Sequence, residues 1–130
     1  TLQELREIFK GGTSVYWLTH YVFGQPSPSH PKTLSQSSID LLIINTVIPF
    51  LYAYGKHKGE ERLCNRASQL LEDLKPENNY ITRMWEECGL KAAHAGDSQA
   101  LIQLKKNYCD SKKCLYCRIG YEYFKKEQKE

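Results

Sequence analysis

The sequence predicts an all-α protein, either an up-and-down helical bundle or a stack of helical hairpins, with about five to six helices. Apolar residues recur three and four positions apart through much of the chain, which is the spacing of one helix face. Short links that contain Pro or Gly separate these stretches, and short links favour antiparallel neighbours. The 130 residues are 41% apolar and 25% charged, as in one ordinary globular domain, so we expect a single domain over residues 1–130.

The best-defined helix is predicted between a capping serine at 37–38 and Tyr54, with Asp40 in its first turn. Apolar residues occupy most of its faces, so we expect it to be buried on most sides. The amide of Asn45 should then find a hydrogen-bond partner within the core, because an unpaired buried amide is costly. Pro49 should kink the helix, since it lacks an N–H and clashes with the preceding turn.

Weaker periodic stretches predict the remaining helices, at residues 2–9, 60–74, 77–88, 97–108 and 118–125. The residues at 97–98 should cap the fourth of these, and Gly55–Gly59 should form a turn. Residues 13–23 form an irregular aromatic segment that is rich in β-branched residues. A strand without a partner or a short helix would both suit this composition.

The N-terminus, the longest apolar run and the cysteine content lead us to expect a cytoplasmic fragment of a longer protein. The chain opens on Thr1 and not on Met, so we expect it to be part of a longer protein, and no signal peptide is recognisable before Leu2. Its longest apolar run, residues 41–54, is short and interrupted by polar residues, so we expect a buried helix and no membrane contact. Five cysteines at uneven spacing do not suit a disulfide framework, which favours a reducing compartment.

Three cysteines form the motif with the most chemistry, because Cys109, Cys114 and Cys117 are spaced as C-x4-C-x2-C. Two thiolates of a C-x2-C pair can face one tetrahedral zinc ion, and the same spacing opens one iron–sulfur pattern. No fourth ligand is evident, because Cys88 and His94 lie at the far end of a helix about 16 Å long. The alternatives are buried thiols that serve packing and, less consistent with a helical fold, a redox C-x2-C pair.

The C-terminal region is basic, with eight Lys and Arg residues against four acidic residues from Leu101 onward. Such a region can attract phosphate, and the tyrosines among the lysines could stack on bases of single-stranded nucleic acid. The simpler alternatives are a solvated helix face and rings that anchor the last helix to the core. The candidate nucleic-acid contacts are Lys105, Lys106, Lys112, Lys113 and Arg118.

No catalytic motif is present in the sequence. It has no phosphate-cradling glycine pattern, nucleophile elbow or paired zinc-binding histidines. His20 lies among aromatic residues and suits a packed side chain better than a catalytic base. His94 precedes Asp97 by three residues in a loop. We therefore expect no enzyme active site within these residues.

Three segments carry a family resemblance: YWLTHYVFG, INTVIPFLYAYGKHKG and SQALIQLKKNYCDSKKCLYCRIG. They resemble the C-terminal part of a bacterial family common in Bacteroidetes, the domain of unknown function DUF2851. The resemblance implies a cytoplasmic protein roughly three times this length, whose front half has a look of restriction-endonuclease-like nucleases. None of those acidic motifs occurs here. The third segment carries Ser98, Gln99, Cys109, Cys114, Cys117 and Gly120, for which the resemblance implies no role.

The functional expectation is a helical accessory or interaction domain of a larger bacterial protein. Its partner would be an upstream domain of the same chain or another protein. The alternatives are a nucleic-acid-binding helper of an upstream nuclease-like domain and a metal-binding module built on the cysteine cluster.

Overall fold

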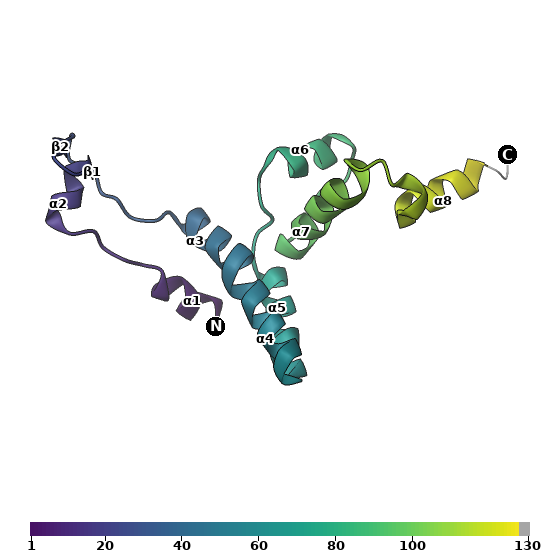
Figure 1. The fold of residues 1–130 in the computed structure, drawn as a ribbon, viewed down its shortest axis with the longest axis horizontal. Helices are drawn as coiled ribbons and strands as arrows, with labels where there is room; N and C mark the ends of the chain where they lie inside the picture. The colour runs from purple at the N-terminus through teal and green to yellow at the C-terminus, as the bar shows by residue number, and fades with distance from the viewer. Residues whose placement is uncertain (128–130) are drawn as a thin grey trace. The chain divides into compact units, whose positions relative to one another are not determined.

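The computed structural model describes residues 1–127, and within them the chain is mostly helical (Figure 1). Helix accounts for 65% of the chain and strand for 4%, in seven contiguous helical segments, which confirms the all-α prediction with slightly more helices than expected. Spatial proximity divides the chain into two compact units, one of residues 1–70 and one that begins at Leu71.

The first unit contains two strands and most of the helices. In chain order they are α1 (Leu2–Ile8), α2 (Val15–Leu18), β1 (His20–Val22), β2 (Gln25–Pro26), α3 (Gln36–Leu42), a π-helical turn (Ile43–Val47), α4 (Ile48–Lys58) and α5 (Glu61–Asp73), whose last residues belong to the second unit. The second unit continues with α6 (Tyr80–Glu87), α7 (Ala95–Leu104), a π-helical turn (Lys105–Cys109), a 3-10 turn (Cys114–Tyr116) and α8 (Arg118–Glu127).

The aromatic segment near the N-terminus contains both structures that its composition allows, a short helix and a strand. Our expectation of an unpaired strand was wrong, because β1 pairs antiparallel with β2. Gly24, at φ 72°, supplies the left-handed residue of the tight turn between them. His20 stacks on Tyr16 with ring centroids 4.0 Å apart, so it is held by packing, as the sequence suggested.

Residues 36–58 form one continuous helix of 23 residues, in which α3, the π-helical turn and α4 follow without a break. Its cap is Ser35, whose hydroxyl accepts from the Ser38 N–H at 3.2 Å, so the helix begins earlier than predicted. By length and composition this helix could cross a membrane, which corrects our view that the apolar run is too short. The core helix of a soluble protein meets the same two criteria, so they alone do not place it in a bilayer.

The same helix is buried along one stripe only, which corrects the prediction that most of its faces are covered. The buried positions recur at helical spacing, at Ile39, Ile43, Ile44 and Ile48. Leu41 and Phe50 are exposed, and so is Asn45, whose amide donates to the Leu41 carbonyl at 3.0 Å. The Asn45 partner therefore lies in its own helix and not in a core.

Pro49 follows the π-helical turn directly. A proline leaves one carbonyl of the preceding turn without its α-helical donor. In the wider turn the Ile48 N–H donates to the carbonyl of Ile43, five residues back. The expected interruption at Pro49 thus takes the form of a π bulge that lets the helix continue.

Arg6 of α1 and Asp40 of α3 form a two-pronged ion pair within the first unit. Their Nε–Oδ1 and Nη2–Oδ2 distances are 2.8 Å and 2.9 Å, and the side chains are only 22% and 17% exposed. The hydrogen bond to Asp40 raises the pKa of Arg6 above its usual value. Asp40 therefore links α1 to α3. Our prediction that it lies in the first turn and stabilises the helix dipole was wrong, because the helix begins earlier and Asp40 is past its first turn.

We expect Asp40→Asn to lower the free energy of unfolding by about 1 to 2 kcal/mol, because it removes the charge from a shielded paired bond. Urea unfolding followed by circular dichroism measures this change. Glu7→Gln is the matched control, since Glu7 of α1 forms an exposed ion pair with Lys10, and its loss should leave the unfolding midpoint unchanged. An equal loss in both variants would contradict a specific role for the Arg6–Asp40 pair.

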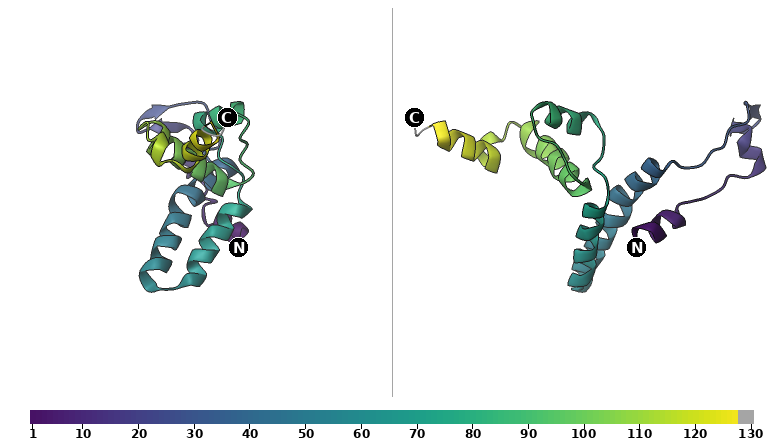
Figure 2. Two further views of the ribbon diagram at one scale, coloured as in Figure 1. Left: turned by 90° about the vertical axis from the view of Figure 1, so that its right-hand side faces the viewer. Right: turned by 180° about the vertical axis from the view of Figure 1, so that it is seen from behind.

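Helices α4 and α5 form an antiparallel hairpin in the first unit (Figure 2). The turn between them is tighter than predicted, because α4 runs through Gly55 and ends at Gly59, which has φ 69°. Gly55 is buried within α4. A Cβ atom built on it would lie 2.9 Å from Cβ of Leu63 and 3.0 Å from Sγ of Cys64. Gly55 thus permits the close approach of the two helices.

The second unit is built around α6 and α7. Asn79 caps α6, and its side-chain oxygen accepts from the backbone N–H groups of Ile81 and Thr82. His94 caps α7 three residues before the predicted position, and Asp97 returns a bond to the Ala93 N–H at 2.9 Å. The indole of Trp85 donates to the Leu101 carbonyl at 3.1 Å, which joins α6 to α7.

Candidate functional site

The candidate site is the segment from Lys105 to Gly120, at the end of the helix that α7 begins. The helix ends in a turn where the Lys112 N–H donates to Cys109 and the Lys113 N–H donates to Tyr108. Lys112 has φ 52°, the left-handed conformation that glycine usually supplies at this position. Tyr108, just before this turn, lines two pockets.

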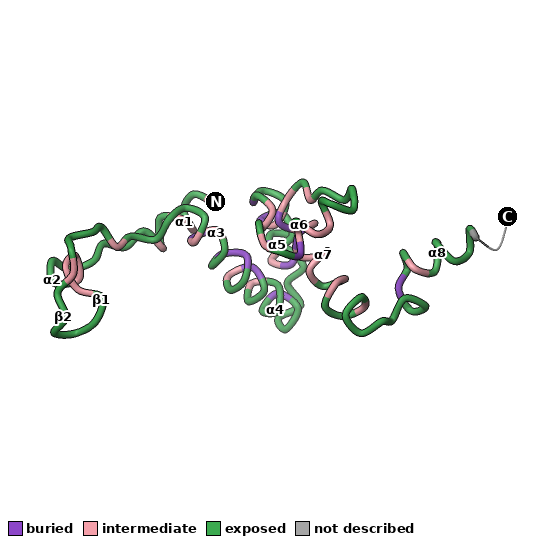
Figure 3. Tube along the Cα trace, turned by 90° about the horizontal axis from the view of Figure 1, so that it is seen from above, coloured by how far each residue is buried: buried purple, intermediate pink, exposed green. Residues whose placement is uncertain are grey.

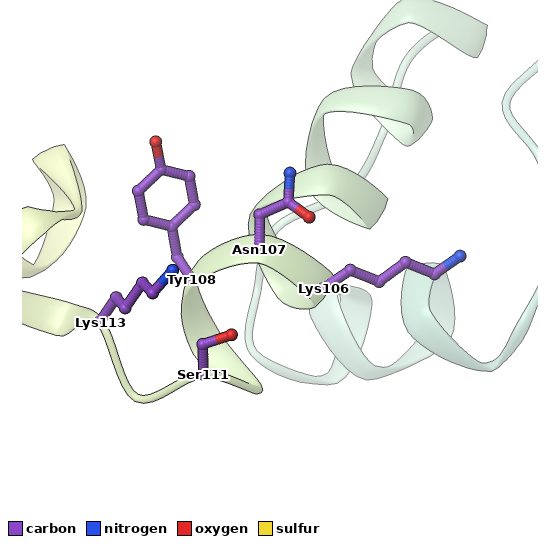
Figure 4. Close-up of a pocket in the computed structure, with 5 residues that line it drawn as sticks. All are labelled: Lys106, Asn107, Tyr108, Ser111 and Lys113. Atoms are coloured by element: carbon purple, nitrogen blue, oxygen red, sulfur yellow. The ribbon is translucent and has the colours of Figure 1, made fainter.

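The first pocket is polar and open to solvent, with a volume of about 370 Å³. It is lined by Lys106, Asn107, Tyr108, Ser111 and Lys113 (Figure 4). Lys113 extends beside the Tyr108 side chain, and Lys106 extends on the other side of Asn107. All five side chains carry a hydrogen-bond donor and none is acidic, so the pocket suits an anion.

The second pocket is apolar, with a volume of about 190 Å³, and it holds all three cysteines of the motif. Besides Cys109, Cys114 and Cys117 it is lined by Trp85, Leu104, Tyr108, Ile119 and Gly120. The structure therefore brings the three predicted thiols to one cavity. Only Cys117 is buried, while Cys109 and Cys114 are exposed as residues.

The three thiols do not form a complete metal centre in the described residues. Among the side chains that the structure describes, no group of three from His, Cys, Asp or Glu is arranged to hold a metal ion. No His, Asp or Glu lines the thiol pocket to act as a fourth ligand of zinc or of an iron–sulfur cluster. The donor set does not fit the group that the C-x2-C spacing suggested.

Cys109 differs from an ordinary exposed cysteine. Partial burial raises the pKa of the Cys109 thiol, and the neighbouring Cys117 and Cys114 raise it further. A raised pKa leaves less thiolate at neutral pH, and the thiolate is the form that reacts with electrophiles. Cys109 is thus poorly suited to be a nucleophile.

We expect Cys109 to be alkylated by iodoacetamide more slowly than Cys88, which is also exposed, at pH 7.5. The Cys109 rate should keep rising with pH beyond about 8.5, the usual thiol value, because its thiolate forms later. Peptide mapping by mass spectrometry measures both rates in one sample. Equal rates at pH 7.5 would contradict the raised pKa.

The candidate nucleic-acid residues divide into two groups. Lys105 pairs with Asp110, and Arg118 pairs with Glu122 at 3.1 Å, so both charges are partly neutralised. Lys106, Lys112 and Lys113 have no acidic partner among the described residues. The unpaired lysines thus lie before, within and after the turn that ends the helix. The tyrosines near these lysines do not anchor the last helix to the core, because Tyr116, Tyr121 and Tyr123 are exposed.

Three other residues of the same motif have structural roles. Ser98 is fully buried, donates to the Ala95 carbonyl at 2.9 Å and accepts from the Glu77 N–H at 3.1 Å. Gln99 donates to the Glu77 side chain. Ser98 and Gln99 thus attach the segment that precedes α6 to helix α7. A Cβ on Gly120 would lie 2.3 Å from the carbonyl oxygen of Cys114, so only glycine fits there.

Sequence reasoning found the lysines and the cysteines but not the rest of the two pockets. Asn107 and Ser111 stand between the lysines in sequence, and their polar side chains were the available signal. Trp85 lies far from the motif in sequence, and nothing in its local pattern links it to the cysteines.

Comparison with known proteins gives one match. The model of the family described as "Protein of unknown function (DUF2851)" matches residues 1–80. The matched range contains the first two resembling segments, while the cysteine-rich segment lies beyond it. No curated protein and no solved structure shows significant similarity. Since the family model covers more than half of the sequence, the chain belongs to the DUF2851 family.

Proposed function

We propose that these residues form a helical accessory domain that packs through α8 against another protein surface, in a larger cytoplasmic bacterial protein. The observation that carries the proposal is the exposure of the apolar side chains of α8. Ile119, Tyr123 and Phe124 share one side of the helix by their spacing, and they are 56%, 61% and 43% exposed. Most of the α8 trace is exposed in Figure 3.

The surroundings of α8 support this reading. Within the described residues α8 packs chiefly against the 3-10 turn at Cys114–Tyr116, which itself exposes Leu115 and Tyr116. Three large apolar side chains on one side of a helix are typical of a face that another surface covers. The partner that we propose is a further part of the same polypeptide. The five free cysteines of the described chain support a reducing compartment such as the cytoplasm.

Site-specific photo-crosslinking in the full-length protein tests the proposal. A photoreactive amino acid placed at Tyr123 should crosslink to another segment of the polypeptide, identified by mass spectrometry. Lys125 is the matched control, because it lies on the opposite side of α8 and is also exposed. A crosslink to a different protein would refute the proposed partner, a further part of the same polypeptide. Equal crosslinking at both positions, or none at either, would refute the proposed face.

A further inference from the structure

We infer that the polar pocket at the end of the α7 helix binds a phosphate group. The pocket is lined by two lysines, an amide and two hydroxyls, from Lys106, Asn107, Tyr108, Ser111 and Lys113, with no carboxylate among them. Ammonium groups and neutral donors are the partners that phosphate oxygens take in proteins. This inference does not depend on the α8 face and goes beyond the proposed accessory role.

The charges nearby favour an anion. The carboxylate of Asp110, which lies between the pocket residues in sequence, is engaged by Lys105. Lys106 and Lys113 have no such partner among the described residues, and in Figure 4 they reach out on either side of Asn107 and Ser111. Because Lys106 points away from Lys113 in Figure 4, a phosphate beside Tyr108 and Ser111 would meet the Lys113 charge directly and the Lys106 charge at longer range.

A helix C-terminus normally disfavours an anion, because its last carbonyl groups carry partial negative charge. Here the turn that ends the helix occupies several of these carbonyls. Lys105, Tyr108 and Cys109 accept from the N–H groups of Asp110, Lys113 and Lys112, at 2.9, 2.9 and 3.0 Å. The local repulsion is therefore reduced, and the lysines determine the sign of the potential.

The open shape of the pocket fits two sources of the same group. A phosphodiester of single-stranded nucleic acid could pass through it, and the Tyr108 ring at its edge offers a surface for a base. A small phosphorylated molecule would present the same oxygens without the strand. Binding of an oligonucleotide and binding of inorganic phosphate distinguish these two sources.

The test measures fluorescence anisotropy of a labelled twelve-nucleotide oligothymidylate with the full-length protein, and calorimetry with inorganic phosphate. Lys106→Gln and Lys113→Gln should each weaken oligonucleotide binding roughly fivefold at low salt, and each should reduce the salt slope by about 0.7. Lys112→Gln is the matched control, because it removes the same charge next to the pocket without lining it. Any oligonucleotide binding to other parts of the protein is the same in all variants and does not affect the comparison between them.

The two sources give different supporting results. Strong oligonucleotide binding that Lys106→Gln and Lys113→Gln weaken, and Lys112→Gln does not, assigns the pocket to a nucleic-acid backbone. Calorimetric binding of phosphate that the same two variants abolish, without an effect on oligonucleotide binding, assigns it to a small phosphorylated ligand. An equal effect of all three variants would show diffuse surface charge and overturn the inference, and so would binding of neither probe. Circular dichroism verifies that the variants keep their helix content.

Discussion

Gly55→Val should lower the free energy of unfolding by about 3 kcal/mol and separate α4 from α5. The first added carbon would lie 2.9 Å from the Leu63 Cβ and 3.1 Å from the Cys64 backbone nitrogen, closer than van der Waals contact allows. The two methyl groups of valine add volume to an already filled interface, and overpacking typically costs 1 to 3 kcal/mol, occasionally more. Urea unfolding followed by circular dichroism measures the loss.

Two further variants separate volume from backbone effects. Gly55→Ala should lose less, since alanine is favoured over glycine within a helix by about 1 kcal/mol and this offsets part of the clash. Gly11→Val should leave the midpoint close to that of the parent, because nothing lies within 4 Å of its added carbon. A Gly55→Val protein as stable as Gly11→Val would contradict the close approach of α4 and α5.

Gly120→Ala should separate α8 from the 3-10 turn beside the thiol pocket, which Gly120 lines. A Cβ at this position would lie 2.3 Å from the Cys114 carbonyl oxygen and 3.0 Å from its carbon, both of them backbone atoms that cannot rotate away. We expect a cost of about 3 kcal/mol for the local structure between the 3-10 turn and α8. Because Cys117 is only 8% exposed, opening should increase its alkylation rate by more than tenfold.

Peptide mapping by mass spectrometry gives this rate together with an internal reference. Cys64, which is buried in the first unit, should keep its slow rate in Gly120→Ala. A general loss of fold would instead expose both cysteines, and an unchanged Cys117 rate would rule out the predicted clash.

Most of the secondary structure follows from local pattern. The stretches predicted as helices at 2–9, 60–74 and 77–88 contain α1, α5 and α6, and the stretch 97–108 overlaps α7, which begins two residues earlier, because helical hydrogen bonds and apolar spacing are properties of short segments. The gathering of three cysteines around one pocket was predictable for the same reason, since nine residues of chain hold all of them.

The errors arose where the local pattern did not reveal what a residue or segment contacts. Asp40 looked like a first-turn residue, but its partner Arg6 is 34 residues away. Asn45 was predicted to be a core amide because apolar residues surround it in sequence. Whether a helix face is buried depends on what packs against it, which periodicity does not reveal. The strand at His20–Val22 found a partner because Gly24 allows a tight turn.

The sequence by itself determined the all-α class, most helix segments, and the residue types that could do chemistry near the C-terminus. These depend on composition and on contacts between near neighbours in the chain. Only the tertiary structure decided that Trp85 lines the thiol pocket, that Ser98 bonds to Glu77 21 residues away, and that Gly55 and Gly120 lie too close to other atoms for a side chain. Packing in three dimensions sets these features, between remote segments for Trp85 and Ser98 and across a turn for Gly55 and Gly120, and apolar periodicity does not encode it.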